Sequence, residues 1–502
     1  MSTIELQQID DHIWQIPQEG EMNVPARVYA SEELLNHIRE DKTLQQAKNV
    51  THLPGIQKFG ITMPDGHQGY GFPVGGVAAL STQNGAISPG AVGYDINCLS
   101  EDSDILLEFG RRRKIEDIKG GLGDERAMVA AERSEPSTIR LLTEHDNKDL
   151  YTVKTETGES LEATLDHPLL TDDGMKKLER IKEGDTIYIH PFKGLPDDDP
   201  VEKTIVTESD LDDADRQLVD ALKERDLLPL KTTDPAFNIL LKLVGYHTGD
   251  GTFNKQGNTA FYGPEEDLET IKDDIDRLGF TASPIYSRDR QHEYNGVEFE
   301  QTEHKVRSTS KAFERLMQEL GAPEGPKVEN DFTVPEYIDN LARWQQALYL
   351  SAFFGAEMSK PSAQTRTNLY CPKISHNRIE EQKDTGRRFM EQIKQLLGNL
   401  DIETNTIEIM ESEANQNHDV VRFRLGIKND SETLIRFFST VGYRYNLEKQ
   451  KKAIQATQYL KKKEKAKQKR TTIAKEAIQL YENGTAPKTI KEEFDINDRF
   501  IE

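Results

Sequence analysis

The spacing of apolar positions changes along the chain, so different elements are predicted for different regions. Residues 31–40 (SEELLNHIRE) repeat at helical spacing, whereas residues 61–98 are rich in glycine, which indicates turns and close backbone approach. From residue 98 to residue 205, short β-like runs such as DILLEF and LYTVKTETG alternate with turn residues. This stretch predicts a compact all-β unit.

The region over residues 236–447 repeats its own pattern, after a helical, acidic connector over residues 206–235. Each copy opens with an apolar helix, FNILLKLVGYHTGDG or WQQALYLSAFFGAEM. It continues through strand candidates and an amphipathic helix, and it closes on a strand followed by a helix. A duplicated αββαββα unit with a pseudo-twofold axis is the simplest architecture that fits.

The last region, residues 448–502, begins with a basic run that we interpret as a linker. A helix, an Asn-Gly turn and a second helix follow at helix-turn-helix spacing. The basic side chains are either phosphate contacts or the solvated face of a lysine-rich helix: Lys461, Lys463, Lys469 and Arg470. The chain ends at Glu502 without a C-terminal signature, so we expect it to be truncated.

These patterns predict a multidomain α+β protein. The expected domains are residues 1–97, 98–205, 206–235, 236–447 and 448–502. Its length requires more than one core, which agrees with this division.

The composition predicts the cellular location of the protein better than it predicts the binding partner. No segment is long and apolar enough to span a membrane, and the N-terminus lacks the layout of a signal peptide, so we expect a cytoplasmic protein. With 88 acidic and 64 basic residues, the net charge of -24 argues against nucleic-acid binding by bulk charge, although a salt-adapted surface would look the same. Two cysteines, Cys98 and Cys371, are too few for a disulfide framework, so each is buried filler or a nucleophile.

Cys98 stands where the pattern changes, and a T-x-x-H turn follows it in GESLEATLDHPLLT. The two segments resemble the first splicing motifs of inteins, which have the Hint fold, an all-β horseshoe. The resemblance implies that the Cys98 thiol attacks the preceding carbonyl and turns the Asn97–Cys98 amide into a thioester. His167 would serve the leaving nitrogen, and Thr164 and Asp166 would orient it.

The alternative is an ordinary turn histidine and a small buried cysteine. Complete splicing also needs a terminal His-Asn pair and a second nucleophile, and neither follows residue 205. We therefore expect this chain to form and hydrolyse the thioester without completing ligation.

Asp250 and Glu357 end the two apolar helices of the repeat, where the LAGLIDADG homing endonucleases carry their two acidic residues. The resemblance implies that the helices pack at a pseudo-dimer seam, that the carboxylates hold Mg²⁺ at the scissile phosphates, and that strands read double-stranded DNA in the major groove. Small residues suit such a seam: Gly245, Gly249, Ala352 and Gly355.

Several positions depart from that family's pattern. Met358 stands where glycine is usual, and Thr333 stands where a basic residue is frequent. Lys327 and Lys360 are the candidate replacements for a catalytic lysine. The alternative is a pair of buried core helices that end in exposed acids.

Residues 1–97 resemble the start of the RtcB RNA ligases, on the segments PDGHQGYGFPVGGVAAL and SPGAVGYDINC. That family joins RNA 3'-phosphate ends to 5'-hydroxyl ends, as in tRNA halves, with Mn²⁺ and GTP. The resemblance implies manganese ligands at Asp95 and Cys98, with Asp65 and His67 either near the metal or structural.

Three functions therefore compete. The chain is a self-processing ligase precursor that contains an endonuclease, a stand-alone homing endonuclease, or an inactive DNA-binding remnant. Cys98 and His167 separate the first from the others, because an endonuclease needs neither residue.

Overall fold

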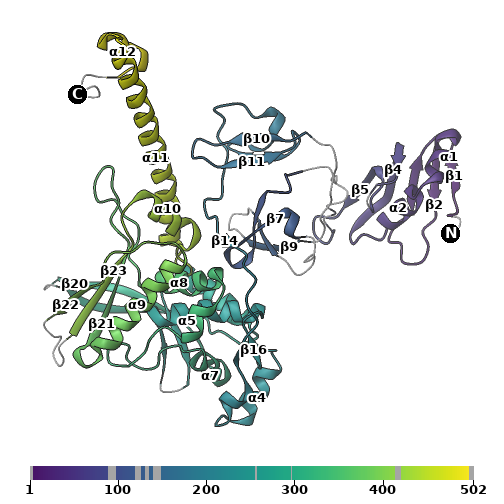
Figure 1. Ribbon diagram of the computed structural model, residues 1–502. Coiled ribbons are helices and arrows are strands. Elements are labelled where there is room, and N and C mark those ends of the chain that lie inside the picture. Colours follow the sequence, from purple (N-terminus) through teal and green to yellow (C-terminus); the bar gives the residue numbers. More distant parts are fainter. Residues whose placement is uncertain are drawn as a thin grey trace. The chain divides into compact units, whose positions relative to one another are not determined.

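The computed structural model describes residues 4–69, 71–86, 88, 98–118, 126–129, 135–139, 149–254, 257–294, 297–412 and 420–496. The chain divides into two compact units (Figure 1). Unit 1 comprises Met1–Leu99, Asp149–Tyr151 and Ala163–Ile187, and unit 2 comprises Ser100–Lys148, Thr152–Glu162 and Tyr188–Glu502. No helix in the described part of the chain is both long and apolar enough to cross a bilayer.

Unit 1 contains a five-stranded sheet in the order β1-β2-β3-β4-β5, in which only the β3–β4 pair is parallel. Two helices connect these parallel strands, as a parallel crossover requires. The elements are β1 (Gln7–Asp10), β2 (Ile13–Ile16), β3 (Ala26–Tyr29), α1 (Glu32–Glu40), α2 (Thr43–Val50), β4 (Ile56–His67) and β5 (Val74–Leu80).

The predicted helix over residues 31–40 is confirmed as α1. The Ser31 hydroxyl caps it by accepting a hydrogen bond from Leu34 N at 3.3 Å. Leu35 and Ile38 are buried on its inner side. Apolar residues of β3 and α2, including Val28 and Leu44, complete this small core.

Between residues 98 and 205, the described residues form strands, isolated bridges and 3-10 turns, and no α-helix. The strands are β6 (Asp104–Leu106), β7 (Arg111–Lys114), β8 (Arg126–Val129), β9 (Glu135–Thr138), β10 (Tyr151–Lys154), β11 (Ser160–Ala163), β12 (Pro168–Thr171), β13 (Gly174–Lys177) and β14 (Leu195–Pro196).

The domain boundaries expected for this stretch stay a prediction, while its residues divide between units 1 and 2. The physical reason lies in its apolar side chains. Phe109 and Leu195 are buried in the large core of unit 2, together with Val206 and residues of the following helices. The connector follows as β15 (Thr204–Val206), α4 (Arg216–Lys223) and β16 (Leu230–Lys231).

Two similar halves make up most of unit 2. The first half runs α5 (Pro235–Asp250), β17 (Gly251–Phe253), β18 (Thr259–Tyr262), α6 (Glu265–Arg277), β19 (Tyr286–Tyr294), β20 (Val297–Ser308) and α7 (Lys311–Glu319). The second half runs α8 (Arg343–Glu357), β21 (Lys373–Ile379), α9 (Lys383–Asn399), β22 (Glu408–Ser412), β23 (Val420–Gly426) and α10 (Ser431–Thr440).

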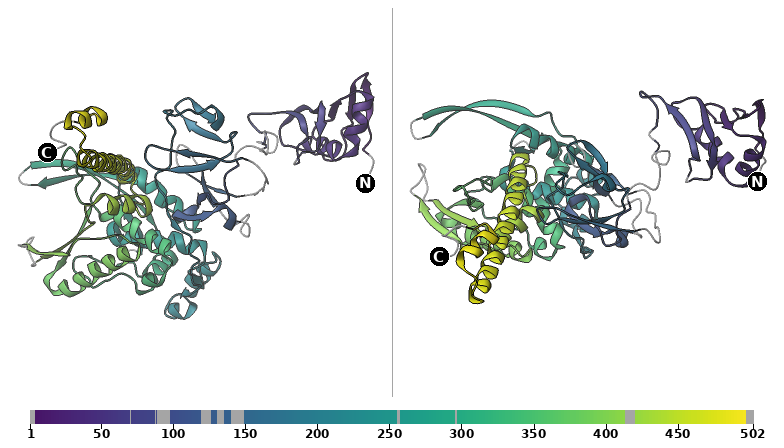
Figure 2. Two further views of the ribbon diagram at one scale, coloured as in Figure 1. Left: turned by 45° about the horizontal axis from the view of Figure 1, so that its top comes forward. Right: turned by 90° about the horizontal axis from the view of Figure 1, so that it is seen from above.

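The sheets of the two halves have matching strand orders, β17-β18-β20-β19 and β21-β23-β22. Figure 2 shows β19 and β20 as one long hairpin. In the second half, the described residues contain no counterpart of β17 except the isolated bridge between Ala363 and Leu369. The second half therefore departs from the expected αββαββα order by one strand.

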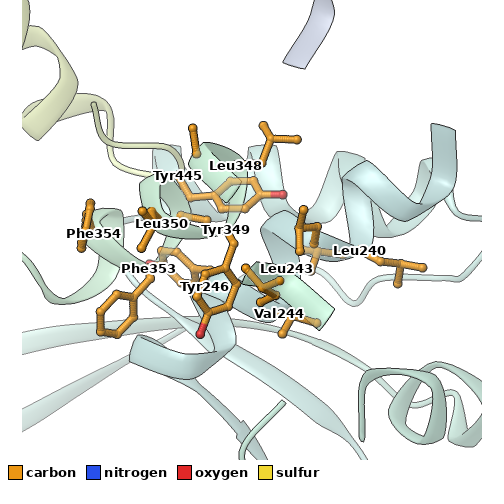
Figure 3. Close-up of a cluster of buried hydrophobic side chains, with 14 of the residues drawn as sticks. Leu240, Leu243, Val244, Tyr246, Leu348, Tyr349, Leu350, Phe353, Phe354 and Tyr445 are labelled. Atoms are coloured by element: carbon orange, nitrogen blue, oxygen red, sulfur yellow. The ribbon is translucent and has the colours of Figure 1, made fainter. Parts of the chain in front are cut away.

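The apolar helices α5 and α8 pack against each other at the centre of unit 2. Their side chains, which include Leu243 of α5 and Tyr349 and Phe353 of α8, form a continuous buried cluster (Figure 3). Both helices are apolar around almost their whole circumference, which suits helices that are covered on all sides.

The basic run that was predicted as a linker is instead part of α11 (Leu447–Glu482), a single long helix (Figure 1). Asn446 caps it through Lys449 N, and the run lacks the glycine or proline that would end a helix. A turn at Asn483–Gly484 leads to α12 (Pro487–Phe494), so the predicted helix, turn and helix are present.

Candidate functional sites

Cys98 and the T-x-x-H turn lie together in unit 1. Leu99 forms an antiparallel bridge with Ala163, which places Cys98 opposite Thr164. Thr164 N donates a hydrogen bond to Cys98 O at 3.1 Å, and Thr164 Oγ1 lies 3.5 Å from the same oxygen. The turn therefore holds the backbone of Cys98 directly.

The turn itself is closed by a hydrogen bond from His167 N to Thr164 O at 3.0 Å. Backbone bonds from Leu178 N to His167 O and from Glu179 N to Leu165 O, each at 2.8 Å, anchor it to the 3-10 helix Leu178–Arg180, which follows β13. Thr164 is buried and His167 is half-buried. The backbone of His167 is thus held by hydrogen bonds at both its N–H and its carbonyl group.

Burial lowers the pKa of His167, and the charge of Asp166 opposes this shift. The imidazole is therefore uncharged near neutral pH and can exchange a proton with a nearby group. Its Nδ1 is buried and has no hydrogen-bond partner within the described residues. Asn97, which contributes the carbonyl of the bond expected to react, lies outside the described residues.

The expected ligase metal residues are not brought together by what the structure describes. Asp95 lies outside the described residues, and the side chain of Asp65 is not described. His67 is exposed at the end of β4. No group of three or more His, Cys, Asp or Glu side chains with metal-binding spacing occurs in the ranges that the structure describes.

The second site lies where α5 and α8 end, at Asp250 and Glu357. Burial, together with the nearby charge of Asp250, raises the pKa of Glu357 to about 7, so the two carboxylates are close enough to repel each other. Burial also raises the pKa of Asp250, whose outer side remains open to solvent. A divalent cation between the two would relieve this repulsion, so the donor set fits Mg²⁺.

The close approach of α5 and α8 depends on glycines in α5. A Cβ at Gly245 would lie 2.3 Å from Tyr349 O, and one at Gly249 would lie 2.4 Å from Ala356 Cβ. Gly355 was expected to serve the same seam, but its close neighbour is Arg444, whose carbonyl oxygen would lie 1.8 Å from an added Cβ. Gly355 thus makes room for the chain before α11 and not for α5.

Two lysines flank the carboxylates in matching ways. Lys327 Nζ donates to His247 O at 2.7 Å and to Gly249 O, in the last turn of α5. Lys449 Nζ donates to Gly355 O at 2.6 Å and to Ala356 O at 2.9 Å, in the last turn of α8. Each ammonium group therefore lies at the negative end of a helix, beside one of the two carboxylates.

The lysine pKa values reflect this environment. Burial lowers the pKa of Lys327 to about 8, while the charges of Asp250 and Glu357 oppose the shift. Burial also lowers the pKa of Lys449, and the same two carboxylates oppose it. Lys360, the other sequence candidate, is exposed and pairs with Glu448 at 3.0 Å, so it is not part of this site.

Lys449 was missed in the sequence because it lies in the run interpreted as a linker. A signal was present: Lys327 follows α7 and Lys449 follows α10, so each lysine comes shortly after the last helix of its half. Comparing the two copies beyond their final helices would have paired them.

Comparison with known proteins identifies similar sequences along nearly the whole chain. Residues 46–182 match the model of the family described as tRNA-splicing ligase RtcB, a match that runs past Cys98. The tRNA-splicing ligase RtcB of Methanopyrus kandleri is 36% identical over 507 residues, which cover 98% of this chain and 50% of the relative.

Other relatives match only parts of the chain. The tRNA-splicing ligase RtcB of Thermococcus kodakarensis is 57% identical over 96 residues, which cover 19% of this chain and 20% of the relative. The DNA-directed RNA polymerase subunit Rpo1N of Methanocaldococcus jannaschii is 30% identical over 397 residues, which cover 73% of this chain and 29% of the relative.

Among solved structures, the homing endonuclease I-WcaI bound to its DNA recognition sequence covers 43% of this chain and 86% of its own, with a TM-score of 0.29 and 17% identity. We draw nothing from a score this low. The chain spans about half the length of the curated relatives that match it end to end, and over nearly its whole length its sequence is similar to tRNA-splicing ligases RtcB.

Proposed function

We propose that this chain is part of the precursor of an RtcB-type tRNA-splicing ligase, interrupted at Cys98 by a self-splicing intein that carries a DNA endonuclease. The proposal rests on the sequence matches, in which different relatives match different parts of the chain. One RtcB ligase matches 19% of the chain at 57% identity, others match 98% or more at 35–36% identity, and a polymerase subunit matches 73% of it. A segment shared between a ligase and a polymerase subunit is expected of an element that inserts into unrelated hosts.

Residues 1–97 would supply the start of the ligase. The complete ligase would join RNA 3'-phosphate or 2',3'-cyclic phosphate ends to 5'-hydroxyl ends and would use Mn²⁺ and GTP. Asp95 and Cys98 are the proposed manganese ligands in this chain. Since Cys98 would leave with the intein, a residue supplied after splicing would take its place, and the ligase would remain inactive until then.

The intein step begins at the Asn97–Cys98 bond. The Cys98 sulfur attacks the Asn97 carbonyl carbon, the carbon–sulfur bond forms, the carbon–nitrogen bond breaks, and the nitrogen takes up a proton as an amine. The contacts of Thr164 with Cys98 O hold the nucleophile in place, and the uncharged imidazole of His167 transfers the proton. Asp166 orients His167 and favours its protonated form.

The endonuclease centre is Asp250 and Glu357, and bound Mg²⁺ would polarise the scissile phosphate and activate water. Lys327 and Lys449 hold positive charge at the helix ends, where negative charge develops on the phosphate. Basic side chains on the strands of the two sheets would contact DNA: Arg288, Arg290, Lys305, Arg307, Lys373, Arg422 and Arg424.

Thiol cleavage tests the intein. Purified protein that is treated with a small thiol at mildly basic pH should release residues 1–97 as a thioester, detected by intact-mass spectrometry. Cys98→Ala should abolish release, whereas Cys371→Ala, which replaces the other cysteine, should not. Release that persists in Cys98→Ala would refute the thioester.

Nicking of an uninterrupted copy of the host gene tests the endonuclease. We expect cleavage that requires Mg²⁺ and that is lost in Asp250→Asn and Glu357→Gln. Activity that persists in Asp250→Asn would refute the assigned site. DNA binding without cleavage in the unmodified protein would instead support the inactive remnant.

A further inference from the structure

We infer that Arg378 is a positioning residue of the Asp250–Glu357 site, which it serves by fixing the loop that carries Lys327. The inference rests on the proposed endonuclease function. Arg378 lies on β21 in the second half, whereas Lys327 lies in the loop of residues 326–332 that follows the first half.

Arg378 is fully buried, with 0% of its surface exposed. Its Nη1 donates to Lys327 O and, at 3.2 Å, to Asn330 O, and its Nη2 donates to Phe332 O at 3.2 Å. The guanidinium also stacks on the Phe332 ring, 3.9 Å from the centroid. Three carbonyl oxygens of one loop therefore converge on a single side chain.

This arrangement uses what is specific to arginine. Removing a charged group from water is costly, and here the carbonyl oxygens of the loop compensate the charge. The planar guanidinium can donate to several carbonyls at fixed angles, which a lysine ammonium on a flexible stem cannot reproduce. Arg378 thus specifies the course of the loop, beyond filling space between β21 and α9.

The loop has further bonds of its own, but among the described residues no other side chain donates to several of its carbonyls. Glu329 N and Asn330 N donate to Pro326 O at 3.0 and 3.1 Å, and Ile379 N donates to Val328 O at 3.0 Å. These bonds shape the turn and attach it to the end of β21. Arg378 adds a bond to the carbonyl oxygen of Lys327 itself, the residue whose side chain reaches the last turn of α5.

A matching contact holds the other lysine. Asp267 of α6, in the first half, is buried and accepts a hydrogen bond from Leu447 N at 2.7 Å, two residues before Lys449. The two contacts are crossed between the halves. Arg378 of the second half holds the segment that brings Lys327 to α5, and Asp267 of the first half holds the segment that brings Lys449 to α8. Correct placement of both lysines then requires both halves to be folded against each other.

The crossed arrangement supplies matched variants. In the full chain, Arg378→Met should speed hydrogen exchange in residues 326–332 and leave residues 445–450 unchanged, and Asp267→Ala should do the reverse. Acylation of Lys327 by a small anhydride at one fixed pH, followed by peptide mass spectrometry, should be faster in Arg378→Met only. Arg378→Lys should restore these properties in part at most.

For nicking, Arg378→Met should lower kcat about tenfold to a hundredfold, the loss expected of a misplaced group, and leave KM within about threefold. Ile393→Ala, which shortens a buried apolar side chain of α9, should destabilise the protein and leave kcat unchanged. Equal loop exchange and equal Lys327 acylation in Arg378→Met and the unmodified protein would overturn the inference. Absence of nicking in the unmodified protein would refute the endonuclease, and the exchange and acylation results would still decide the positioning role.

Discussion

At the scale of single residues, the two candidate sites differ in how charge is used. His167 is half-buried and uncharged, which suits proton exchange beside a reacting peptide bond. Asp250 and Glu357 instead form a like-charge pair at the ends of two helices, and Lys327 and Lys449 offset part of the repulsion. Motifs indicated His167, Asp250 and Glu357, and Lys327 was a sequence candidate, but Lys449 has no motif and was found only from its neighbours in space.

The role of His167 predicts a large kinetic effect. His167→Ala should slow thiol-induced release of residues 1–97 by about 10²- to 10⁴-fold, because the leaving nitrogen loses its proton source. His190→Ala, an exposed histidine of the same stretch, should release the fragment at the normal rate. Intact-mass spectrometry over time measures both, and equal rates for the two variants would contradict the role of His167.

The raised pKa of Glu357 predicts a pH-dependent stability. Its pKa of about 7 lies above the ordinary 4.5, so between these values the folded protein binds more protons than the unfolded protein. The stabilising effect of the protonated carboxyl is therefore present below pH 4.5 and is lost as the pH rises to about 7, by at most about 1.4 kcal/mol per pH unit.

Glu357→Gln should accordingly have a higher Tm than the unmodified protein at pH 8, and the difference should shrink toward pH 4.5. Calorimetry without divalent cations measures this. Glu448→Gln is the matched control with opposite sign, because hydrogen bonds from Lys452 and Lys360 hold the pKa of Glu448 at about 2. A Tm difference for Glu357→Gln that does not vary with pH would contradict the charge repulsion.

At the scale of elements, the apolar helix pair is the feature that the sequence described best. Continuous apolar helices with small residues predicted a tight seam, and α5 and α8 pack closely at Gly245 and Gly249. The basic run was misread because charge alone does not end a helix, and α11 continues through it without a break. The sequence alone also did not show which element each small residue approaches. Gly355, for example, approaches Arg444 and not α5.

The seam predicts an asymmetric response to alanine. Gly245→Ala should lower the free energy of unfolding by about 1–3 kcal/mol, because its Cβ would meet Tyr349 O at 2.3 Å. Gly398→Ala in α9 should raise it by up to about 1 kcal/mol, because a Cβ there meets nothing within 4 Å and alanine favours the helix. Denaturant melts of both variants measure this, and a stabilising Gly245→Ala would contradict the close approach.

At the scale of the whole molecule, the boundaries of compact units do not follow the changes in sequence pattern. Residues around Phe109 and Leu195, predicted to belong to a separate all-β domain, are part of the core built by the helices of unit 2. A polar network strengthens this link: Arg277 joins Glu108 at 2.7 Å to Asp274 at 3.3 Å, and the buried Asp274 pairs with Lys242 at 2.5 Å. The residues around Phe109 and Leu195 therefore share a core with the candidate endonuclease, whereas Cys98 and His167 belong to unit 1.

This shared core predicts that Phe109→Ala destabilises unit 2 as a core substitution would, by about 3–5 kcal/mol. Urea unfolding can be followed by the fluorescence of Trp344, in a Trp14→Phe background that removes the only other tryptophan. Met175→Ala, an exposed apolar residue of unit 1, should leave the transition in place. An unchanged Trp344 transition in Phe109→Ala would show that the segment is not part of this core.

The sequence by itself determined the local elements and the reactive residue types. Helical spacing predicted α1, α5 and α8, and motif chemistry singled out Cys98, His167, Asp250 and Glu357, because hydrogen bonding within an element and the reactivity of a side chain depend on neighbours along the chain. Tertiary structure alone placed Lys449 at the end of α8 and Arg378 against the carbonyl of Lys327, paired Lys360 with Glu448, and packed residues 100–118 into unit 2. These outcomes depend on burial and on contacts between residues far apart in the chain, which no local pattern records.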